Sequence, residues 1–438
     1  METNLKTAEN AELFNLHEPT EALPDQIKKN KSVVGRISYT HNPTGPSNGF
    51  GKGGSTQFEV TIQNAQQLDV DNTYVEGDVT LSGHGTAAKY VSFVGAQTSL
   101  TSVSVELDGK KLVDIQSNAD RIADFNLYTS KTNDQLDYME SLMGCNVNMK
   151  NGDTLTFRIP LSLFGCSIST LLPTGSINST LRFRFNVNMN PLNQLFKGTT
   201  GTAGNNETPG NACVLTYNNL RIVSEFIELQ PLVLNKMLDL IESNNGLTIP
   251  YHAYYIDNRS IPTGTPVLNE RVTISYNNVI SIAQLPYQAG RAAGADTNYY
   301  RTLKWNASLK GINDIRQYLV NFEGSQYYNI ASNQGQTGKA EHAQALINST
   351  RSESTTPGHG SQAIKNLDDY QVLSCNFVRS SSTLSASIID SGVNARLLSS
   401  ILTTSANFGA NITTTNLSTI VKFTRRIVFK NSLLDIMS

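Results

Sequence analysis

The sequence of 438 residues predicts an all-β protein with two tandem β-sandwiches and a few short helices in loops and at the domain joint. Apolar and polar residues alternate in many short runs, as in strands that bury one face. Turn-forming residues separate the runs, which fall into two blocks of about 200 residues, each the size of one ordinary domain. Charged residues make up only 16% of the chain, so Asn, Ser, Thr and Gln supply much of the polar surface. These residues favour turns and strand edges over exposed helices.

The strands of the first half are predicted from this period of two. Phe58, Val60 and Ile62 alternate with polar residues, which is typical of a half-buried strand. Similar runs lie at 75–81, 90–94, 103–107, 112–115, 155–159, 181–187 and 214–226. Asp108 and Gly109 stand between two of these runs and predict a tight hairpin, because both turn residues must accept positive φ.

Two helices are predicted from their apolar spacing. The first runs over 136–143 and ends at Gly144; the second runs over about 231–245, with proline in its first turn and Gly246 after its end. We take the second helix as the joint between two domains. The predicted organisation is an N-terminal arm at 1–31, a first sandwich at 32–230, a helical joint at 231–249 and a second sandwich at 250–438.

The second half repeats the layout of the first without an alignable sequence repeat. Alternating runs lie at 272–276, 279–282, 303–309, 370–378, 384–389, 395–402 and 420–429. The Ala-rich segment 339–347 predicts a helix, and the type of 312–330 is ambiguous. The run at 420–429 closes the second half as 220–226 closes the first.

Three polar loops are long enough to carry function, at 190–212, 284–300 and 349–362. They are candidates for outward-facing projections or for contacts between subunits, and plain solvent-exposed connections are the alternative. The arm at 1–31 mixes acids, lysines and isolated apolar residues, with a short helix possible over 7–16. It either reaches a neighbour or forms a loose tail.

The charge balance argues against several partners. The net charge is −2, and the one basic cluster, Lys28–Lys31, is short, so we expect no direct sequence-specific binding of nucleic acid. No apolar run reaches the ~20 residues of a membrane-spanning helix, and we expect no secretory signal. Four cysteines lie outside any CxxC pair and are expected to be buried thiols.

Motifs for catalysis or cofactor binding are missing from the sequence. The histidines form no HExxH pattern, and Ser162 and Ser169 lie in no GxSxG frame. The glycine-rich segment 49–54 lacks the spacing of a phosphate-binding loop and leads into a strand. The acidic pairs Asp69/Asp71 and Asp368/Asp369 could hold calcium, but such pairs more often cap turns. We therefore expect no catalytic residue, no cofactor site and no metal site.

Four segments in order resemble the double jelly-roll major capsid proteins. This family includes those of nucleocytoplasmic large DNA viruses, virophages, polinton-like viruses, adenovirus (the hexon) and tailless membrane-containing phages. The similar segments are VSVELDGKKLVDI at 103–115, FRIPLSL at 157–163, the Leu-Leu-Pro bend at 171–173 with the strand 181–187, and LRIVSEFIEL at 220–229. The acidic and arginine-rich stretch that large-virus members carry next is replaced by 230–235, and 380–385 and 391–392 match the later Pro-Ser-Gly motif only loosely.

The resemblance implies that each sandwich is a jelly roll and that the protein is structural. It implies homotrimeric, pseudo-hexameric capsomers that tile an icosahedral shell and locate the protein to the virion. Implied partners are neighbouring capsomers, penton and minor capsid proteins, and an internal membrane through the N-terminal arm. Two alternatives stay open: a shell-plus-protruding-domain capsid or spike protein of a small RNA virus, and a β-sandwich carbohydrate-binding adhesin.

Overall fold

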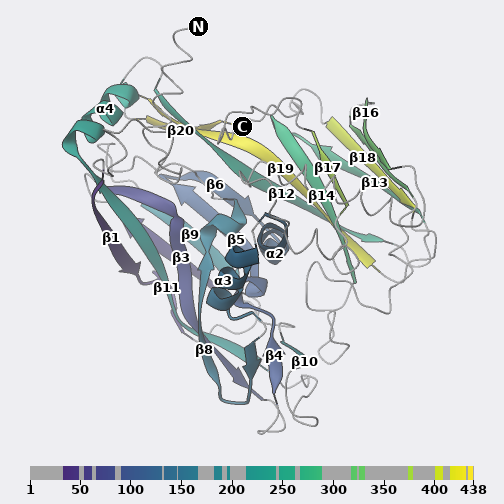
Figure 1. Ribbon diagram of the computed structural model, residues 1–438, viewed down its shortest axis with the longest axis horizontal. Helices are drawn as coiled ribbons and strands as arrows, with labels where there is room; N and C mark the ends of the chain where they lie inside the picture. The colour runs from purple at the N-terminus through teal and green to yellow at the C-terminus, as the bar shows by residue number, and fades with distance from the viewer. Residues whose placement is uncertain are drawn as a thin grey trace.

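The computed structural model confirms an all-β chain built from two jelly rolls (Figure 1). The structure describes residues 33–48, 54–61, 66–83, 90–130, 133–145, 147–165, 182–189, 195–197, 214–242, 246–261, 267–288, 317–322, 325–330, 373–377, 400–407, 415–430 and 433–437.

Two four-stranded antiparallel sheets form the first jelly roll. One sheet has the order β1-β11-β3-β8, and its strands are β1 (Val33–His41), β11 (Val214–Leu229), β3 (Gln66–Ser82) and β8 (Thr154–Pro160). The other has the order β2-β9-β5-β6, and its strands are β2 (Gly54–Thr61), β9 (Arg182–Met189), β5 (Leu100–Leu107) and β6 (Lys110–Ile115). The predicted hairpin joins β5 to β6, and both Asp108 and Gly109 have positive φ, 49° and 75°.

A small third sheet and two helices complete this half. The sheet has the order β10-β4-β7, from β10 (Leu195–Lys197), β4 (Val91–Phe93) and β7 (Val147–Met149). The helices are α2 (Ala119–Ser130) and α3 (Asn133–Met143), and short 3-10 turns lie at Ala96–Ser99 (η2) and Leu161–Phe164 (η3). Helix α2 contacts both turns and β5, which buries it in the interior.

The second jelly roll has the same construction. Its first sheet has the order β12-β19-β14-β17, from β12 (Leu247–Ile261), β19 (Thr415–Lys430), β14 (Val279–Gln288) and β17 (Leu373–Asn376). Its second sheet has the order β13-β18-β15-β16, from β13 (Val267–Ile274), β18 (Ser400–Asn407), β15 (Gln317–Phe322) and β16 (Ser325–Ile330). The last strand, β20 (Leu433–Met437), pairs with the end of β19, and helix α4 (Pro231–Glu242) lies between β11 and β12.

The two halves share one strand order. If the eight main strands of each half are numbered along the chain, both halves have one sheet in the order 1-8-3-6 and a second in the order 2-7-4-5. This arrangement defines a jelly roll, a sandwich in which the first and last strands are neighbours in one sheet. The duplication that the sequence predicted as a layout is therefore present strand by strand.

A β-bulge in β11 requires a glycine at the facing position of β3, Gly77. Asn218 pairs with Asp78 and Arg221 with Glu76, so two residues of β11 stand opposite Gly77. A Cβ at Gly77 would lie 2.7 Å from a methyl carbon of Leu220 and 3.1 Å from the carbonyl oxygen of Asn218. Only glycine fits opposite the bulge without displacing its backbone.

We expect Gly77→Ala to lower the free energy of unfolding by about 1–3 kcal/mol, the usual cost of overpacking. Gly35→Ala is the matched control in another strand of the same sheet, because no heavy atom lies within 4 Å of the position of its Cβ. Denaturant unfolding of both variants measures the difference. If the two variants were equally stable, the bulge would have to shift and make room for the new methyl group at no cost in free energy.

Several expectations are corrected by the structure. The loop at 190–212 includes β10, and the loop at 284–300 starts later than predicted because β14 continues to Gln288. The ambiguous segment 312–330 contains β15 and β16. The sequence missed β1, β7, β12 and β20 as separate strands. The predicted arm at 1–31, the helices at 7–16 and 339–347, the strands at 303–309 and 384–389 and the loop at 349–362 lie outside the described residues.

Candidate functional site

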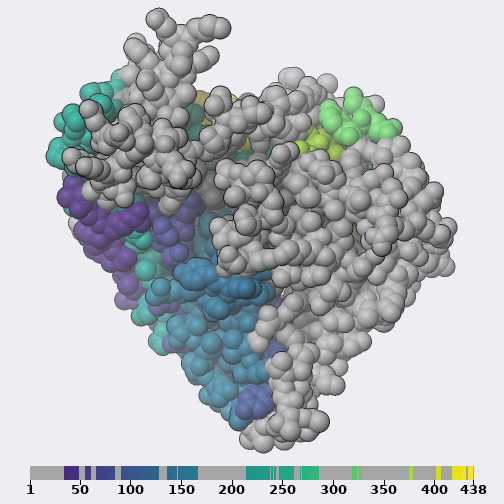
Figure 2. Space-filling view, viewed as in Figure 1, coloured from purple at the N-terminus to yellow at the C-terminus, as the bar shows by residue number. Residues whose placement is uncertain are grey.

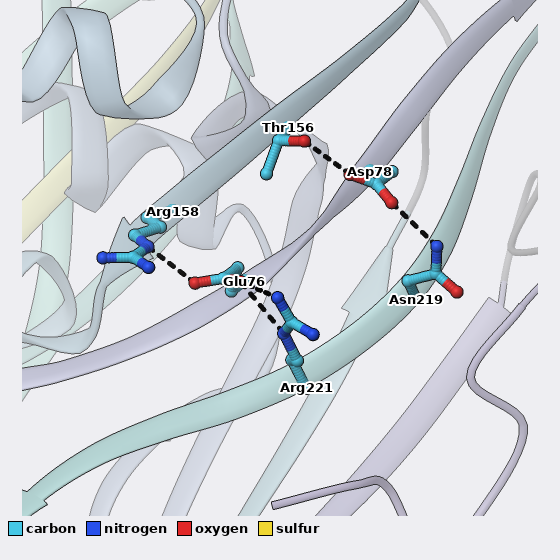
Figure 3. A network of polar contacts seen from close by, with 6 residues as sticks. All are labelled: Glu76, Asp78, Thr156, Arg158, Asn219 and Arg221. Carbon is cyan, nitrogen blue, oxygen red and sulfur yellow. Dashed lines mark hydrogen bonds and ion pairs between the residues drawn. The ribbon is translucent and has the colours of Figure 1, made fainter. Parts of the chain in front are cut away.

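The outer face of the β1-β11-β3-β8 sheet carries a network of charged side chains (Figure 3). Glu76 of β3 lies at its centre, with its side chain only 5% exposed. Arg158 of β8 donates a hydrogen bond from Nε to Glu76 at 2.6 Å, and Arg221 of β11 donates one from Nε at 2.9 Å and a second from its terminal nitrogen. The two guanidinium groups are about half exposed, so they shield the carboxylate while keeping their own contact with water.

A second carboxylate extends the network along β3. Asp78 accepts hydrogen bonds from the side chains of Asn219, at 2.8 Å, and Thr156, at 2.7 Å. These two bonds, in that order, together with the charge of Arg221 hold the pKa of Asp78 below its usual value. Asn219 is the bulge residue, with φ 54°, and its backbone N–H donates to the side chain of Asn48. The network thereby fixes the bulge and the register of three strands.

The charges in this network balance. Arg36 of β1 and Glu225 of β11 form an ion pair at 2.8 Å. With the residues above, the network joins three arginines and three carboxylates on neighbouring strands. Cross-strand pairs of opposite charge stabilise a sheet by a few tenths of a kcal/mol each. The six groups together carry no net formal charge.

The joint between the jelly rolls is built on the hairpin strand β6. The hydroxyl of Tyr251 in β12 donates to the carbonyl oxygen of Leu112 at 3.1 Å, and Arg425 of β19 donates to that of Lys111 at 3.0 Å. Lys110 and Asp435 of β20 add an exposed ion pair at 3.4 Å. Backbone oxygens of β6, which lies at the edge of its sheet, are thus satisfied by the second jelly roll.

Central strands of the second jelly roll are buried on both faces. Every residue from Leu417 to Thr424 in β19 and from Val279 to Leu285 in β14 is buried. One face packs inside the jelly roll, where Gln284 donates to Thr404 of the opposite sheet at 2.7 Å. Figure 1 shows β12 and β19 above α2 and β6 of the first jelly roll, and buried side chains of both halves belong to one continuous apolar cluster. The described parts of the two jelly rolls therefore share one apolar core.

Gly165 marks the closest approach in this joint. It follows η3 with φ 93°, and a Cβ there would lie 2.7 Å from the ring of Tyr254 and 3.2 Å from the carbonyl oxygen of His252. Both residues belong to β12 and are buried. The backbone after η3 therefore packs directly against the second jelly roll.

Residues considered for chemistry are dispersed in the structure. Within the described ranges, no three His, Cys, Asp or Glu side chains cluster in a way that could hold a metal ion. Ser55 and Thr56, which follow the glycine-rich segment, lie in strand β2. Asp69 accepts hydrogen bonds from the backbone and side-chain nitrogens of Asn72, at 3.3 and 2.9 Å, within strand β3 where its register with β11 shifts. Outside the described residues lie His17, His84, His342, His359, Asp368 and Asp369.

Buried thiol and phenol groups predict a sensitivity to high pH. Burial raises the pKa of the Cys375 thiol from 9.0 to about 12. Burial also raises the pKa of Tyr217 above its usual 10.0, although its hydrogen bond with Ser99 opposes the shift. Both groups bind their protons more tightly in the folded state, so the stability that they contribute is complete below pH ~9 and is lost as the pH rises toward the folded pKa values.

We expect the denaturant midpoint to fall steadily between pH ~9 and ~11. Cys375→Ala removes one of the titrating groups and should flatten the decline, while lowering the midpoint at pH ~8 slightly because it leaves a small cavity. Denaturation curves read by far-UV circular dichroism measure both effects. A midpoint independent of pH over this range in both proteins would contradict the assignment.

None of the helices that the structure describes is long and apolar enough to span a membrane.

Comparisons of the sequence and of the structure give different results. No family model and no curated protein sequence matches the chain. Solved structures do match. The capsid protein VP54 of the virus PBCV-1, fitted into a reconstruction of the virophage Sputnik, is similar at a TM-score of 0.63 and 12% identity, with 92% of this chain and 96% of that chain covered.

Two further structures agree. The Faustovirus major capsid protein is similar at a TM-score of 0.62 and 11% identity, with 95% of this chain and 93% of that chain covered. A chain of the Sputnik virophage gives a TM-score of 0.53 and 10% identity, with 96% and 93% covered. Nearly the whole length of each chain is aligned, so the likeness extends over both jelly rolls and their joint. The chain therefore has the double jelly-roll fold of these viral capsid proteins.

Proposed function

We propose that the chain is a major capsid protein that assembles as homotrimeric, pseudo-hexameric capsomers of an icosahedral shell. The observation that carries this proposal is the repeat of one strand order in two jelly rolls that share one apolar core. Three copies of such a body around a three-fold axis present six similar walls. Objects with six similar walls tile a surface with hexagonal neighbours.

The surface chemistry supports an assembly role. The network around Glu76 pairs three basic with three acidic side chains across the sheet and carries no net formal charge. The whole chain is nearly neutral, at −2. Faces without net charge do not repel copies of themselves, which lets identical subunits approach at ordinary salt concentrations.

The finer partners follow from this role and are part of the proposal. The chain contacts itself within the trimer, neighbouring capsomers, and penton and minor capsid proteins, and an internal membrane is a partner for the arm at 1–31. Its place is the virion, and it has no enzymatic activity, no cofactor and no direct sequence-specific contact with nucleic acid. The chain divides into the arm, a first jelly roll at 32–230, a helical joint at 231–249 and a second jelly roll at 250–438. The position of α4 between β11 and β12 supports this division.

The two alternatives have less support. A shell-plus-protruding-domain protein has no need for the same strand order in both halves, which this chain has. A carbohydrate-binding adhesin needs clustered exposed aromatic side chains, but Tyr254 is buried and Tyr255, beside it, packs against Tyr276 at 5.6 Å between ring centroids.

The test is the assembly state of the purified chain. Size-exclusion chromatography with light scattering should give the mass of three chains, and electron microscopy should show six-sided particles that associate into hexagonal arrays. A stable monomer that does not associate at any concentration would overturn the proposal.

A further inference from the structure

The fifth main strands of the two jelly rolls, β6 and β16, have the same local structure. Each begins directly after a short hairpin connection, with Lys110 as the first residue of β6 and Ser325 as the first residue of β16. Each also has a bulge at its third residue, Leu112 in β6 and Tyr327 in β16. Lys110 of the first half therefore corresponds to Ser325 of the second half.

Strand β6 is covered by the second jelly roll of its own chain. It contacts β12 and β20, and Lys110 forms its ion pair with Asp435 of β20 at 3.4 Å. Backbone oxygens of β6 accept hydrogen bonds from Tyr251 and Arg425, and Leu112 is only 1% exposed. This coverage protects a strand that would otherwise be an open edge of its sheet.

Strand β16 has no such cover in the described part of the chain. It pairs with β15 on one side, and no described strand pairs with its other side. Ser325 and Gln326, which correspond to Lys110 and Lys111, are exposed. Because the two strands share one structure, the cover that β20 gives to β6 predicts a cover of the same kind for β16.

The counterpart of β20 in the first half is helix α4. β20 follows the eighth strand of the second jelly roll, β19, and pairs with its last residues, from Arg426 to Lys430. In the first jelly roll the eighth strand is β11, and α4 follows it at Pro231. The shared strand order therefore gives the two segments corresponding places, β20 beside β6 and α4 beside the matching strand of another jelly roll.

Helix α4 exposes apolar side chains to solvent. Most of its residues are apolar, but Ile241 alone is buried among those of its side chains that the structure describes. Leu232 is 68% exposed, and Val34 at the start of β1 is 60% exposed. In Figure 2 the teal α4 lies at the surface of the molecule. A helix of this composition is stabilised mainly by burying its apolar side against a partner.

Charge complementarity distinguishes the two covers. β6 begins with Lys110 and Lys111, and the segment that covers it supplies the carboxylate of Asp435. β16 has the sequence SQYYNI, without a charged residue. An apolar side chain such as Leu232 can approach β16 without removing water from a charge.

We infer that α4 of one copy covers β16 of the next copy in the trimer, as β20 covers β6 within each chain. This inference rests on the proposed function, because it assigns a contact inside the proposed trimer. Each chain supplies one α4 and one β16, so three identical heterologous contacts close the ring. Contacts within a chain and contacts between chains then alternate around the capsomer.

Leu232→Glu tests the contact in the full chain. The new carboxylate would lose water against the uncharged β16, so the chain concentration at which half of the protein is trimeric should rise about tenfold or more. Leu433→Glu is the matched control, because Leu433 is 72% exposed on β20, which covers β6 of its own chain. It should form trimers like the parent protein. Light scattering over a dilution series measures both variants.

A pair of cysteines tests which chains are joined. Leu232→Cys combined with Ser325→Cys should react with a short bis-maleimide to give a covalent product of three chains, because each chain is linked to the next. Leu433→Cys combined with Ser325→Cys is the control and should give little of this product.

Three results would separate the contact from the proposed function. Trimers that form equally well with Leu232→Glu, or a three-chain product no greater than that of the control pair, would overturn the contact between α4 and β16 while leaving the trimer intact. A Leu232→Glu protein that forms normal trimers but no longer binds the phospholipid vesicles that the parent binds would also overturn it, since α4 would then face a membrane. A parent protein that is monomeric would instead overturn the proposed function.

Discussion

Gly165→Ala is expected to loosen the two jelly rolls from each other. The new methyl group meets the ring of Tyr254 and the backbone of His252, and the positive φ of 93° adds strain for any residue with a Cβ. Together these effects should lower the free energy of unfolding by about 2–5 kcal/mol. Calorimetry should show a lower transition temperature and a broader transition, because the joint weakens before either jelly roll does.

The matched control is Gly152→Ala. Gly152 also has a positive φ, 90°, but no heavy atom lies within 4 Å of the position of its Cβ. The control therefore contains the backbone strain without the clash, and should cost about 1–2 kcal/mol. If both variants lost the same stability, close packing at Gly165 would play no part in the joint.

Phe423→Ala should have a comparable or larger effect. The ring of Phe423 is 4% exposed and stacks on Tyr276 at 4.0 Å between centroids. Truncating a buried phenylalanine removes its apolar burial and leaves a cavity, which costs about 3–5 kcal/mol. The denaturant midpoint of the purified variant measures the loss.

Phe423→Leu separates the loss of the aromatic stack from the loss of volume. It keeps most of the buried apolar surface and should cost less than half as much as the alanine variant, with a small change in the near-ultraviolet circular dichroism of the tyrosines. Equal losses for the two variants would mean that the stack on Tyr276, rather than the filled volume, supplies the stability.

Alternation in the sequence predicted those strands that bury one face. Phe58 and Val60 in β2 and Val103 and Val105 in β5 are buried while their neighbours are less so, and these strands were predicted. The turn at Asp108 was predicted because its geometry depends on two adjacent residues alone.

Of the strands covered on both faces, the sequence predicts runs in β14 and β19 but misses β12. In β12, four consecutive residues from Tyr251 to Tyr254 are buried, so no period of two appears there, and Pro250 is read as a break. In β14 the run 279–282 is predicted, whereas its end at 286–288 begins with a proline and is predicted as a loop. The second face of these strands is buried by the other jelly roll, and the local sequence pattern carries no information about that contact.

The polar network around Glu76 could not be predicted from the sequence for a different reason. Glu76 is 82 residues from Arg158 and 145 residues from Arg221 along the chain. Only the pairing of β3 with β8 and β11 brings them together, and that pairing depends on the bulge at Asn219.

The shared strand order determines when each half can complete its fold during synthesis. In each half the first main strand pairs with the eighth, so β1 waits for β11 and β12 waits for β19. The first half can close while the ribosome is still making the second, whereas the second half closes only when the C-terminal strands have emerged. Contacts between residues so distant along the chain form slowly. The longest-lived incomplete state of newly made protein is therefore the one in which β19 has not yet paired with β12. Helper chaperones at that stage would raise the yield of assembly-competent subunits.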